Sequence, residues 1–547
     1  MLLIECSKIK KYFGDKLILN IDSLRIYSND RIGIVGINGI GKTTLINILS
    51  EKIEPDEGML KLHGKYSFIS QLDLPERKYV RKEIASKFGV KSKWDERMSG
   101  GEKTRFKLAE ALDNDSVLIF ADEPTSNVDI EGIELIEKKF LEYKGALVVI
   151  SHDRSFLDKL CNQILEIDNW KIKIYKGNYS NYEEQKAKEI ERAQFEYEEY
   201  INEKKRLNEV ICSTKQKVKS IRNAPKRMGN SEARLHKMGN QKAKANLDSS
   251  VKNIQKRIDN LKVKEKPKEQ PKIKLDVLES SRLHSKIIIE GNNINKKLND
   301  KIIFKNAELK LYNGSKAALI GPNGCGKSTL IKMIMDMDNN DTIRISQGAK
   351  IGYFSQDFDI LNKDLSIIEN IMESSIYPEN FARLLLARLL FKGESIYKKI
   401  SILSGGERVK VSFAKILLQD INLLILDEPT NYVDINTIKV MEETLREYDR
   451  TLLFVSHDRR FISSIANQIM TIENHQIEVF NGNYTEYLSR SSKSLNKNKD
   501  IQEQIIVLKN RLTEVLGRLS MPSKKDNVEA LDKEYYLILE KLKKFKE

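Results

Sequence analysis

The chain has 547 residues with a formal net charge of +15, and 32% of them are charged. This length allows roughly three to four domains, and a pI near 9.2 favours an anionic partner. We expect no membrane-spanning helix and no signal peptide, and the unpaired spacing of Cys6, Cys161, Cys212 and Cys325 argues against a metal or disulfide framework and for a reducing cytoplasm.

The first motif along the chain is a phosphate-binding pattern. Residues 31–35 form a short apolar run that predicts a buried strand, and Gly36 to Thr43 then fit G-x-x-x-x-G-K-[ST] before an apolar helical pattern. The glycines allow backbone N–H groups to surround phosphate oxygens at a helix N-terminus. Lys42 is expected to reach the β- and γ-phosphates, and the Thr43 hydroxyl to bind Mg²⁺.

A long antiparallel helical hairpin is predicted between residues 182 and 270. On its return leg the apolar residues follow a 4-3-4-3 spacing, which is typical of a narrow coiled-coil seam: Leu247, Val251, Ile254, Ile258 and Leu261. Pro225, Gly229 and Asn230 break the pattern between the legs, and Ser231 is placed as the N-cap of the second leg.

The charge of this hairpin is graded along its length. Residues 183–203 carry eight acidic against three basic side chains, whereas residues 211–270 carry 17 Lys and Arg against five acidic ones. This grading favours contact with a phosphate backbone, and a solvated spacer is the alternative. The candidate RNA-binding residues lie at the tip, about 222–241: Arg222, Lys226, Arg227, Arg234, His236 and Lys237.

The second half of the chain repeats the first. Its phosphate-binding pattern at 321–328 follows the first copy by 285 residues, and Gln356 follows Gln71 by the same interval. Three further features recur 305 residues apart, which excludes chance: Ser-Gly-Gly-Glu at 99–102 and 404–407, an apolar run ending in Asp-Glu at 122–123 and 427–428, and Ser-His-Asp at 151–153 and 456–458. Beyond Tyr487, we expect a Ser/Lys/Asn linker and then a small helical hairpin that serves docking, dimerisation or RNA contact.

This ordered set of motifs resembles the ATP-binding cassette family over both halves. The resemblance implies an α/β fold with two nucleotide-binding domains of the P-loop type, joined by the helical hairpin and followed by a C-terminal helical hairpin. The expected domains are residues 1–181, 182–270, 271–487 and 488–547. Because the spacing between Gln71 and Ser99 is 20 residues shorter than in the second half, the first helical subdomain should be short.

The resemblance also implies an ATP hydrolase that uses Mg²⁺. Glu123 and Glu428 would polarise the attacking water, and His152 and His457 would hold the γ-phosphate. The metal would be held through Thr43, Gln71, Asp122, Ser328, Gln356 and Asp427. The expected ATP-binding residues are Phe13, Gly36, Asn38, Gly39, Gly41, Lys42, Thr43, Thr44, Ser99, Gly100, Gly101, Gly321, Pro322, Asn323, Gly324, Gly326, Lys327, Ser328, Thr329, Ser404, Gly405 and Gly406.

The sequence departs from the family pattern at Ser126, where the second half has Asn431, and at the position on which adenine would stack. Phe13 precedes Gly36 by 23 residues and fits the aromatic residue on which adenine stacks, but the matching residue before Gly321 is Leu298. We therefore predict weaker base affinity or looser nucleotide choice at the second site.

Two cassettes without membrane spans, separated by a long hairpin, resemble the ABC-F subfamily, and the tip looks like that of Vga-type antibiotic-resistance proteins. The resemblance implies a monomer that binds the bacterial ribosome, contacting large-subunit rRNA and P-site tRNA. It would enter the tRNA exit site and relieve lincosamides, pleuromutilins and group A streptogramins. The alternatives are a housekeeping translation factor of the same subfamily, or an ATPase serving a separate membrane or DNA-repair partner.

Overall fold

The computed structural model describes residues 1–70, 73–75, 77–220, 230–264, 266, 283, 285–298, 301–336, 342–355, 360–391, 393–520 and 528–544. For the helical residues 230–241, 243, 491–507, 518, 528–531, 542 and 544 it describes the backbone alone. The chain forms two compact units. Unit 1 comprises residues 1–68, 116–122 and 144–272, and unit 2 comprises residues 69–115, 123–143 and 273–547.

Unit 1 is built on one mixed sheet, with strand order β4-β1-β2-β9-β8-β3-β7-β6-β5. Its central strands β6, β7, β3 and β8 are parallel. Strands β3, β6 and β7 are almost continuously apolar because both faces of a parallel sheet are covered, whereas β8 contains both apolar and polar residues. The strands are β1 (Leu2–Phe13), β2 (Lys16–Tyr27), β3 (Arg31–Val35), β4 (Glu57–Leu62), β5 (Tyr66–Ile69), β6 (Leu118–Asp122), β7 (Ala146–Ile150), β8 (Gln163–Asp168) and β9 (Lys171–Lys176), and the short helices are α1 (Lys42–Leu49) and α5 (Arg154–Leu160).

Unit 2 contains a three-stranded sheet, β11-β10-β13, and a six-stranded sheet, β14-β15-β16-β12-β17-β18. Its strands are β10 (Ile287–Leu298), β11 (Lys301–Tyr312), β12 (Lys316–Ile320), β13 (Ile343–Ile345), β14 (Ile351–Phe354), β15 (Leu423–Asp427), β16 (Thr451–Val455), β17 (Gln468–Glu473) and β18 (Gln476–Asn481). Its helices from the second half are α8 (Lys327–Met335), α9 (Ile367–Met372), α10 (Glu379–Arg388), η3 (Gly393–Tyr397), η4 (Ile400–Ile402), α11 (Gly405–Leu417), α12 (Ile435–Glu447) and α13 (Arg459–Ile465).

Three helices from the first half of the sequence also belong to unit 2: α2 (Lys82–Lys87), α3 (Gly100–Asp113) and α4 (Ile130–Glu142). Between β5 and the Ser-Gly-Gly helix α3, the described residues of the first half form only α2, whereas the second half has α9, α10 and two 3-10 helices between β14 and α11. The first helical subdomain is therefore short, as the spacing of the motifs predicts.

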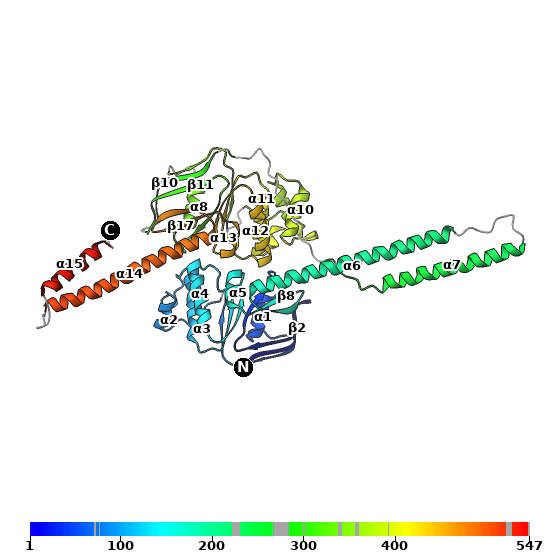
Figure 1. The fold of residues 1–547 in the computed structure, drawn as a ribbon, viewed down its shortest axis with the longest axis horizontal. Coiled ribbons are helices and arrows are strands. Elements are labelled where there is room, and N and C mark those ends of the chain that lie inside the picture. Colours follow the sequence, from blue (N-terminus) through cyan, green and yellow to red (C-terminus); the bar gives the residue numbers. More distant parts are fainter. Residues whose placement is uncertain are drawn as a thin grey trace. The chain divides into compact units, whose positions relative to one another are not determined.

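The predicted hairpin is confirmed by two long helices, α6 (Tyr179–Ser220) and α7 (Asn230–Asp259), which lie side by side in antiparallel fashion (Figure 1). Leu207 and Ile211 are buried in its seam, and cross-helix contacts such as Arg257 to Glu203 at 3.2 Å hold the legs together. Helix α7 begins one residue before the predicted cap, Ser231.

The prediction of a linker beyond Tyr487 is wrong. Helix α14 runs unbroken from Tyr484 to Ser520 and turns into α15 (Val528–Lys544), with Val515 and Ile538 in the seam between them. Ser, Lys and Asn carry only a modest helix penalty, and residues 488–516 contain neither Gly nor Pro to interrupt the helix. None of the helices that the structure describes combines the length and apolar character needed to cross a membrane.

Candidate functional site

The two phosphate loops have nearly the same geometry. Each joins a buried strand to a helix that begins at its lysine, with Gly41 and Gly326 in the left-handed region at φ of 110° and 116°. At Gly326 a Cβ atom would lie 2.4 Å from the Ile303 side chain, so a larger residue would not fit there. The lysine ammonium of each loop donates to the first glycine carbonyl at 2.7 Å, Lys42 to Gly36 and Lys327 to Gly321.

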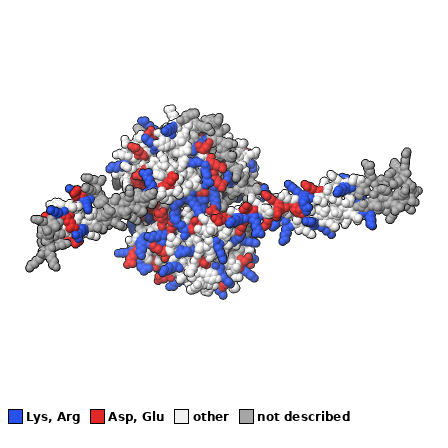
Figure 2. All heavy atoms as spheres, in the orientation of Figure 1, with Lys and Arg blue, Asp and Glu red and all other residues white. Residues whose placement is uncertain are grey.

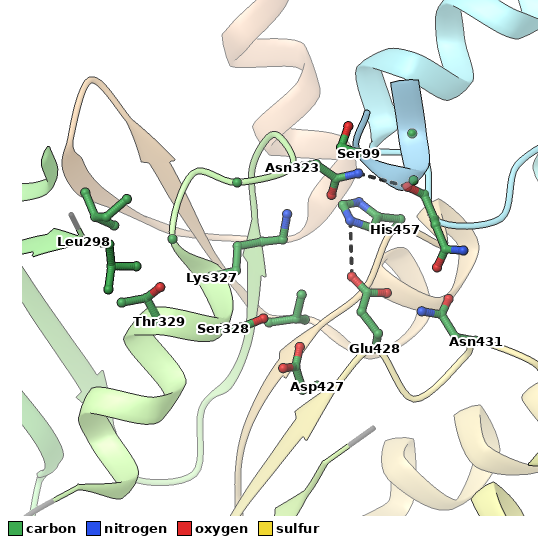
Figure 3. Close-up of a pocket in the computed structure, with 17 residues that line it drawn as sticks. Ser99, Leu298, Asn323, Lys327, Ser328, Thr329, Asp427, Glu428, Asn431 and His457 are labelled. Carbon is green, nitrogen blue, oxygen red and sulfur yellow. Dashed lines mark hydrogen bonds and ion pairs between the residues drawn. The ribbon is translucent and has the colours of Figure 1, made fainter. Parts of the chain in front are cut away.

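A cavity of about 530 Å³ lies over the second phosphate loop, within unit 2 (Figure 3). Lys327, Ser328 and Thr329 open its helical wall, and Asp427 and Glu428 come from the end of β15. The complete lining is Ser99, Gly100, Gly101, Asn127, Leu298, Ile303, Asn323, Gly324, Gly326, Lys327, Ser328, Thr329, Asp427, Glu428, Asn431, Val455 and His457. This set has the phosphate loop, acidic strand end and histidine that the sequence predicts for one nucleotide site.

Residues from the first half of the sequence complete this cavity. Ser99 caps α3 and forms a capping box with Glu102. Ser99, Gly100 and Gly101 all line the cavity, so the amino end of α3 faces it. Asn323 of the phosphate loop donates its backbone N–H to Asp129 at 2.9 Å and its side-chain amide to the Asn127 carbonyl at 2.9 Å. Burial opposes the charge of Asp129, but the backbone hydrogen bonds from Asn323 and Gly132 outweigh it and lower its pKa. Ser99, an expected ATP-binding residue, therefore lines the cavity of the second phosphate loop.

The candidate base and histidine of this site are buried next to each other. Nε2 of His457 lies 3.2 Å from Oε1 of Glu428 (Figure 3). Glu428 Oε1 and His457 Nδ1 are both buried without a hydrogen-bond partner among the described residues. Buried polar atoms of this kind call for a specific reason, and a position beside a ligand cavity supplies one.

Burial controls the proton affinity of both groups. It raises the pKa of Glu428 to about 7, although the Lys327 ammonium favours the charged carboxylate. Burial also lowers the pKa of His457 to about 4, and Lys327 adds to this effect. At neutral pH the imidazole is therefore uncharged, and Glu428 is close to its midpoint, as suits a general base.

Both candidate bases stand in strained backbone. Glu123 and Glu428 have φ of 50° and 49°, in the left-handed region that non-glycine residues rarely adopt. Strain of this kind collects at functional sites, where the surrounding structure must hold it in place. Each glutamate directly follows a fully buried strand, β6 or β15, which provides that support.

A hydroxyl group meets a carboxylate at each phosphate loop. The Thr43 hydroxyl donates to Asp122 at 3.0 Å in unit 1. In unit 2, burial raises the pKa of Asp427, while a hydrogen bond from Ser328 opposes the rise. Among the residues that the structure describes, no group of three or more His, Cys, Asp or Glu side chains could hold a metal ion. These pairs therefore suit a hard cation that brings most of its ligands as phosphate and water oxygens.

The two nucleotide regions differ where a base would stack. Phe13 is 54% exposed, which excludes a core role and leaves its ring available for stacking. Leu298 is 47% exposed and lines the cavity together with Ile303. Among the described lining residues, none is Phe, Tyr or Trp.

The remaining predicted residues are located as follows. Ser404 caps α11 with the same capping box as Ser99, and Ser404, Gly405 and Gly406 are absent from the described lining of the cavity. Thr44 lies in α1, and His152 follows β7. Asn38 accepts from Lys42 at 3.2 Å, and the Pro322 carbonyl accepts from Lys327 at 3.1 Å. Gly39, like Gly324, has φ near 75°.

Some predicted residues cannot be placed. Gln71, Gln356, Arg222, Lys226 and Arg227 lie outside the described residues. Arg234, His236 and Lys237 belong to α7, of which the backbone alone is described there.

Sequence reasoning missed Asn127, Ile303, Asn431 and Val455 as cavity residues. Asn127 contributes a backbone carbonyl to Asn323, so its residue type carries no signal. Its place in the loop between Glu123 and Asp129 is the only hint. Ile303 lines the cavity from β11, and nothing distinguishes it in the sequence from other apolar strand residues.

The sequence and the fold are both similar to those of known proteins. A family model described as ABC transporter matches residues 19–91 and 304–431, and a second model with the same description matches residues 165–244. The likeness extends to a solved structure, the RNase-L Inhibitor, with a TM-score of 0.60 at 18% identity, covering 89% of this chain and 93% of that one. At this identity the likeness shows the fold.

Relatives of similar length include three bacterial proteins. The putative ATP-binding protein YdiF of Bacillus subtilis is 30% identical, over 92% of this chain and 85% of its own. The ribosome protection protein VmlR of the same organism is 28% identical, over 94% and 92%. The erythromycin resistance ATP-binding protein MsrA of Staphylococcus epidermidis is 29% identical, over 85% and 96%.

The likeness to these relatives spans both cassettes and the hairpin, and the paired phosphate loops and acidic strand ends are those of an ATPase. The chain therefore belongs to the ABC-F subfamily of ATP-binding cassette proteins and is an ATP hydrolase.

Proposed function

We propose that this ATPase acts on the bacterial ribosome and protects it from antibiotics that bind the peptidyl-transferase centre. In this proposal the hairpin enters from the tRNA exit site and contacts large-subunit rRNA beside P-site tRNA. The drugs concerned would be lincosamides, pleuromutilins and group A streptogramins. Two relatives carry names of this kind, a ribosome protection protein and an erythromycin resistance protein.

The observation that carries the proposal is the charged hairpin. At 1.5 Å per residue, the 42 residues of α6 span about 63 Å. Acidic side chains gather on the described part nearest its base, where Glu196 and Glu203 are paired with basic residues (Figure 2). Farther along, the described lysines are exposed: Lys215, Lys217, Lys219, Lys242, Lys244 and Lys252. A stiff rod with a basic surface fits a partner made of phosphate backbones.

We also propose that Mg²⁺ accompanies each nucleotide. Thr43 with Asp122, and Ser328 with Asp427, would hold it together with the predicted Gln71 and Gln356. The ion would neutralise phosphate charge during hydrolysis. The enzyme's own residues would do the rest: Lys327 and the loop N–H groups would bind phosphate, and Glu428 would orient water with His457 beside it.

Ribosome binding can be tested with hydrolysis blocked. The Glu123→Gln and Glu428→Gln double variant should bind ATP without cleaving it and should sediment with ribosomes when ATP is present. The wild-type protein with ADP should remain in the supernatant. A double variant that stays free of ribosomes at saturating ATP would refute the proposed partner.

Drug protection requires a separate test of the tip. Alanine replacements at Lys226, Arg227, Arg234 and His236 should lower the antibiotic tolerance of a susceptible host and leave ATP turnover unchanged. The charge-matched control replaces three exposed lysines of unit 1, Lys61, Lys65 and Lys171, with alanine. If tip and control variants give equal tolerance, the housekeeping translation factor becomes the better description.

A further inference from the structure

The hairpin is attached to the first cassette by a partly buried carboxylate. Glu166 of β8 has a side chain only 13% exposed. It accepts hydrogen bonds from three groups: the Lys186 ammonium at 2.7 Å, the Tyr182 hydroxyl at 2.9 Å and the Tyr175 hydroxyl at 3.2 Å. Lys186 and Tyr182 lie in the second and first turns of α6, so Glu166 fixes the helix where it leaves the sheet.

A second carboxylate extends this attachment. Glu189, one turn further along α6, accepts from Lys173 of β9 and shares the single hydrogen of the Tyr175 hydroxyl with Glu166, at oxygen–oxygen distances of 3.0 Å and 3.2 Å. The rings of Tyr175 and Tyr182 meet edge to face with centroids 5.0 Å apart. Burial raises the pKa of both phenols, and the negative charge of Glu166 adds to the rise, so both hydroxyls remain donors at physiological pH.

The same carboxylate lies one strand from the first phosphate loop. In the parallel pairing of β3 with β8, Val35 is in register with Glu166, and Val35 immediately precedes Gly36. A Cβ atom at Gly36 would lie 3.0 Å from the carbonyl oxygen of Ile167, the next residue of β8. The first glycine of the phosphate loop therefore packs on the strand segment that carries Glu166.

The second cassette lacks this attachment at the matching place. Its residue in register with Ile320, just before Gly321, is Thr471. The helix that leaves this cassette, α14, packs there through aromatic rings, with Phe480 and Tyr487 centroids 6.0 Å apart. Thr471 and Phe480 replace the carboxylate and hydroxyl of Glu166 and Tyr175, so among the described residues the Glu166 cluster has no counterpart at the base of α14.

We propose that Glu166 is a positioning residue that couples the first phosphate loop to the hairpin. Nucleotide binding at Gly36–Thr43 shifts the β3–β8 edge, and the ion pair and phenol hydrogen bonds of Glu166 pass this shift to the first turns of α6. The ion pair and the hydroxyl hydrogen bonds constrain both the direction and the distance of α6 from the sheet. Aromatic packing constrains α14 less strictly. The inference concerns the isolated protein, so it does not depend on which partner the hairpin meets.

The test measures hydrogen exchange in α6 with and without ATP. The Glu123→Gln and Glu428→Gln background prevents hydrolysis, and saturating ATP is compared with ADP. In this background we expect ATP to change the exchange rates of residues 182–192 at least threefold. Adding Glu166→Thr, which copies the second cassette, should abolish that change while ATP still saturates both sites. An ATP response that survives Glu166→Thr overturns the proposal.

Three further variants separate coupling from folding. Tyr182→Phe keeps the ring packing and removes one hydrogen bond, so it should retain part of the response, and Lys186→Met should lose most of it. Thr471→Ala is the matched control in the second cassette and should leave the response of α6 intact. If Glu166→Thr unfolds the protein, the Tyr182 and Lys186 variants decide, and full responses in both would overturn the proposal. The experiment contains no ribosome, so its failure is distinct from failure of the proposed partner.

Discussion

The two cassettes differ less in their phosphate loops than in the walls around them. Lys42 and Lys327 bond to their loops at the same 2.7 Å, and Glu123 and Glu428 share the same rare backbone conformation. By contrast, Phe13 in one half corresponds to Leu298 in the other. Phosphate chemistry requires a fixed geometry, whereas the contacts to the nucleotide base can vary because they add affinity without taking part in the reaction.

The largest expected effect tests whether the matched glutamates perform the same task. The Glu123→Gln and Glu428→Gln double variant should release phosphate about 100- to 10,000-fold more slowly than the wild type, since it lacks both general bases. ATP binding, measured by equilibrium dialysis, should persist. Glu394→Gln, at an exposed position, is the control and should retain full turnover.

Each single variant then divides the rate between the two sites. Turnover remaining in Glu123→Gln reports the second site, and turnover remaining in Glu428→Gln reports the first. If the double variant keeps more than a tenth of the wild-type rate, neither glutamate is the base and the functional equivalence of the two strand ends is lost.

A smaller effect concerns the pH dependence of the second site. Because burial raises the pKa of Glu428 to about 7, the carboxylate form needed for a base grows as pH rises through that value. In the Glu123→Gln variant, phosphate release should therefore increase about tenfold from pH 6 to pH 8. His457, with a pKa of about 4, stays neutral over this interval and therefore adds no further change to the pH–rate profile. A flat profile between pH 6 and pH 8 would contradict the assignment of Glu428 as the base.

Sequence reasoning predicted the parts of the site whose chemistry demands particular residue types. The phosphate loops, the acidic strand ends and the hairpin seam all follow from spacing and polarity. It could not predict that Asn127 offers a backbone carbonyl, because every residue carries one. It also missed Glu166, whose role depends on register with Val35 across the sheet and not on any local pattern. The helical continuity of α14 through residues 488–500 was missed because their composition suggested a linker.

The smallest expected effect concerns binding of the nucleotide base. Leu298→Phe should strengthen ATP binding at the second site about 2- to 12-fold, since an aromatic pair contributes about 0.5–1.5 kcal/mol beyond burial. The Lys42→Ala background removes nucleotide binding at the first site. Equilibrium dialysis with ATP and CTP then measures which nucleotide the second site prefers. Phe13→Leu in a Lys327→Ala background should weaken the first site by a similar factor, and Leu298→Met is the matched aliphatic control.

The unmodified sites already bear on this prediction. If they bind ATP with equal affinity in the two backgrounds, then the exposed ring of Phe13 contributes nothing that Leu298 lacks. Stacking would then not explain the difference between the walls. If Leu298→Phe tightens ATP more than CTP, the aliphatic wall is what leaves the second site indifferent to the base, because a purine offers a larger face to a ring than a pyrimidine does.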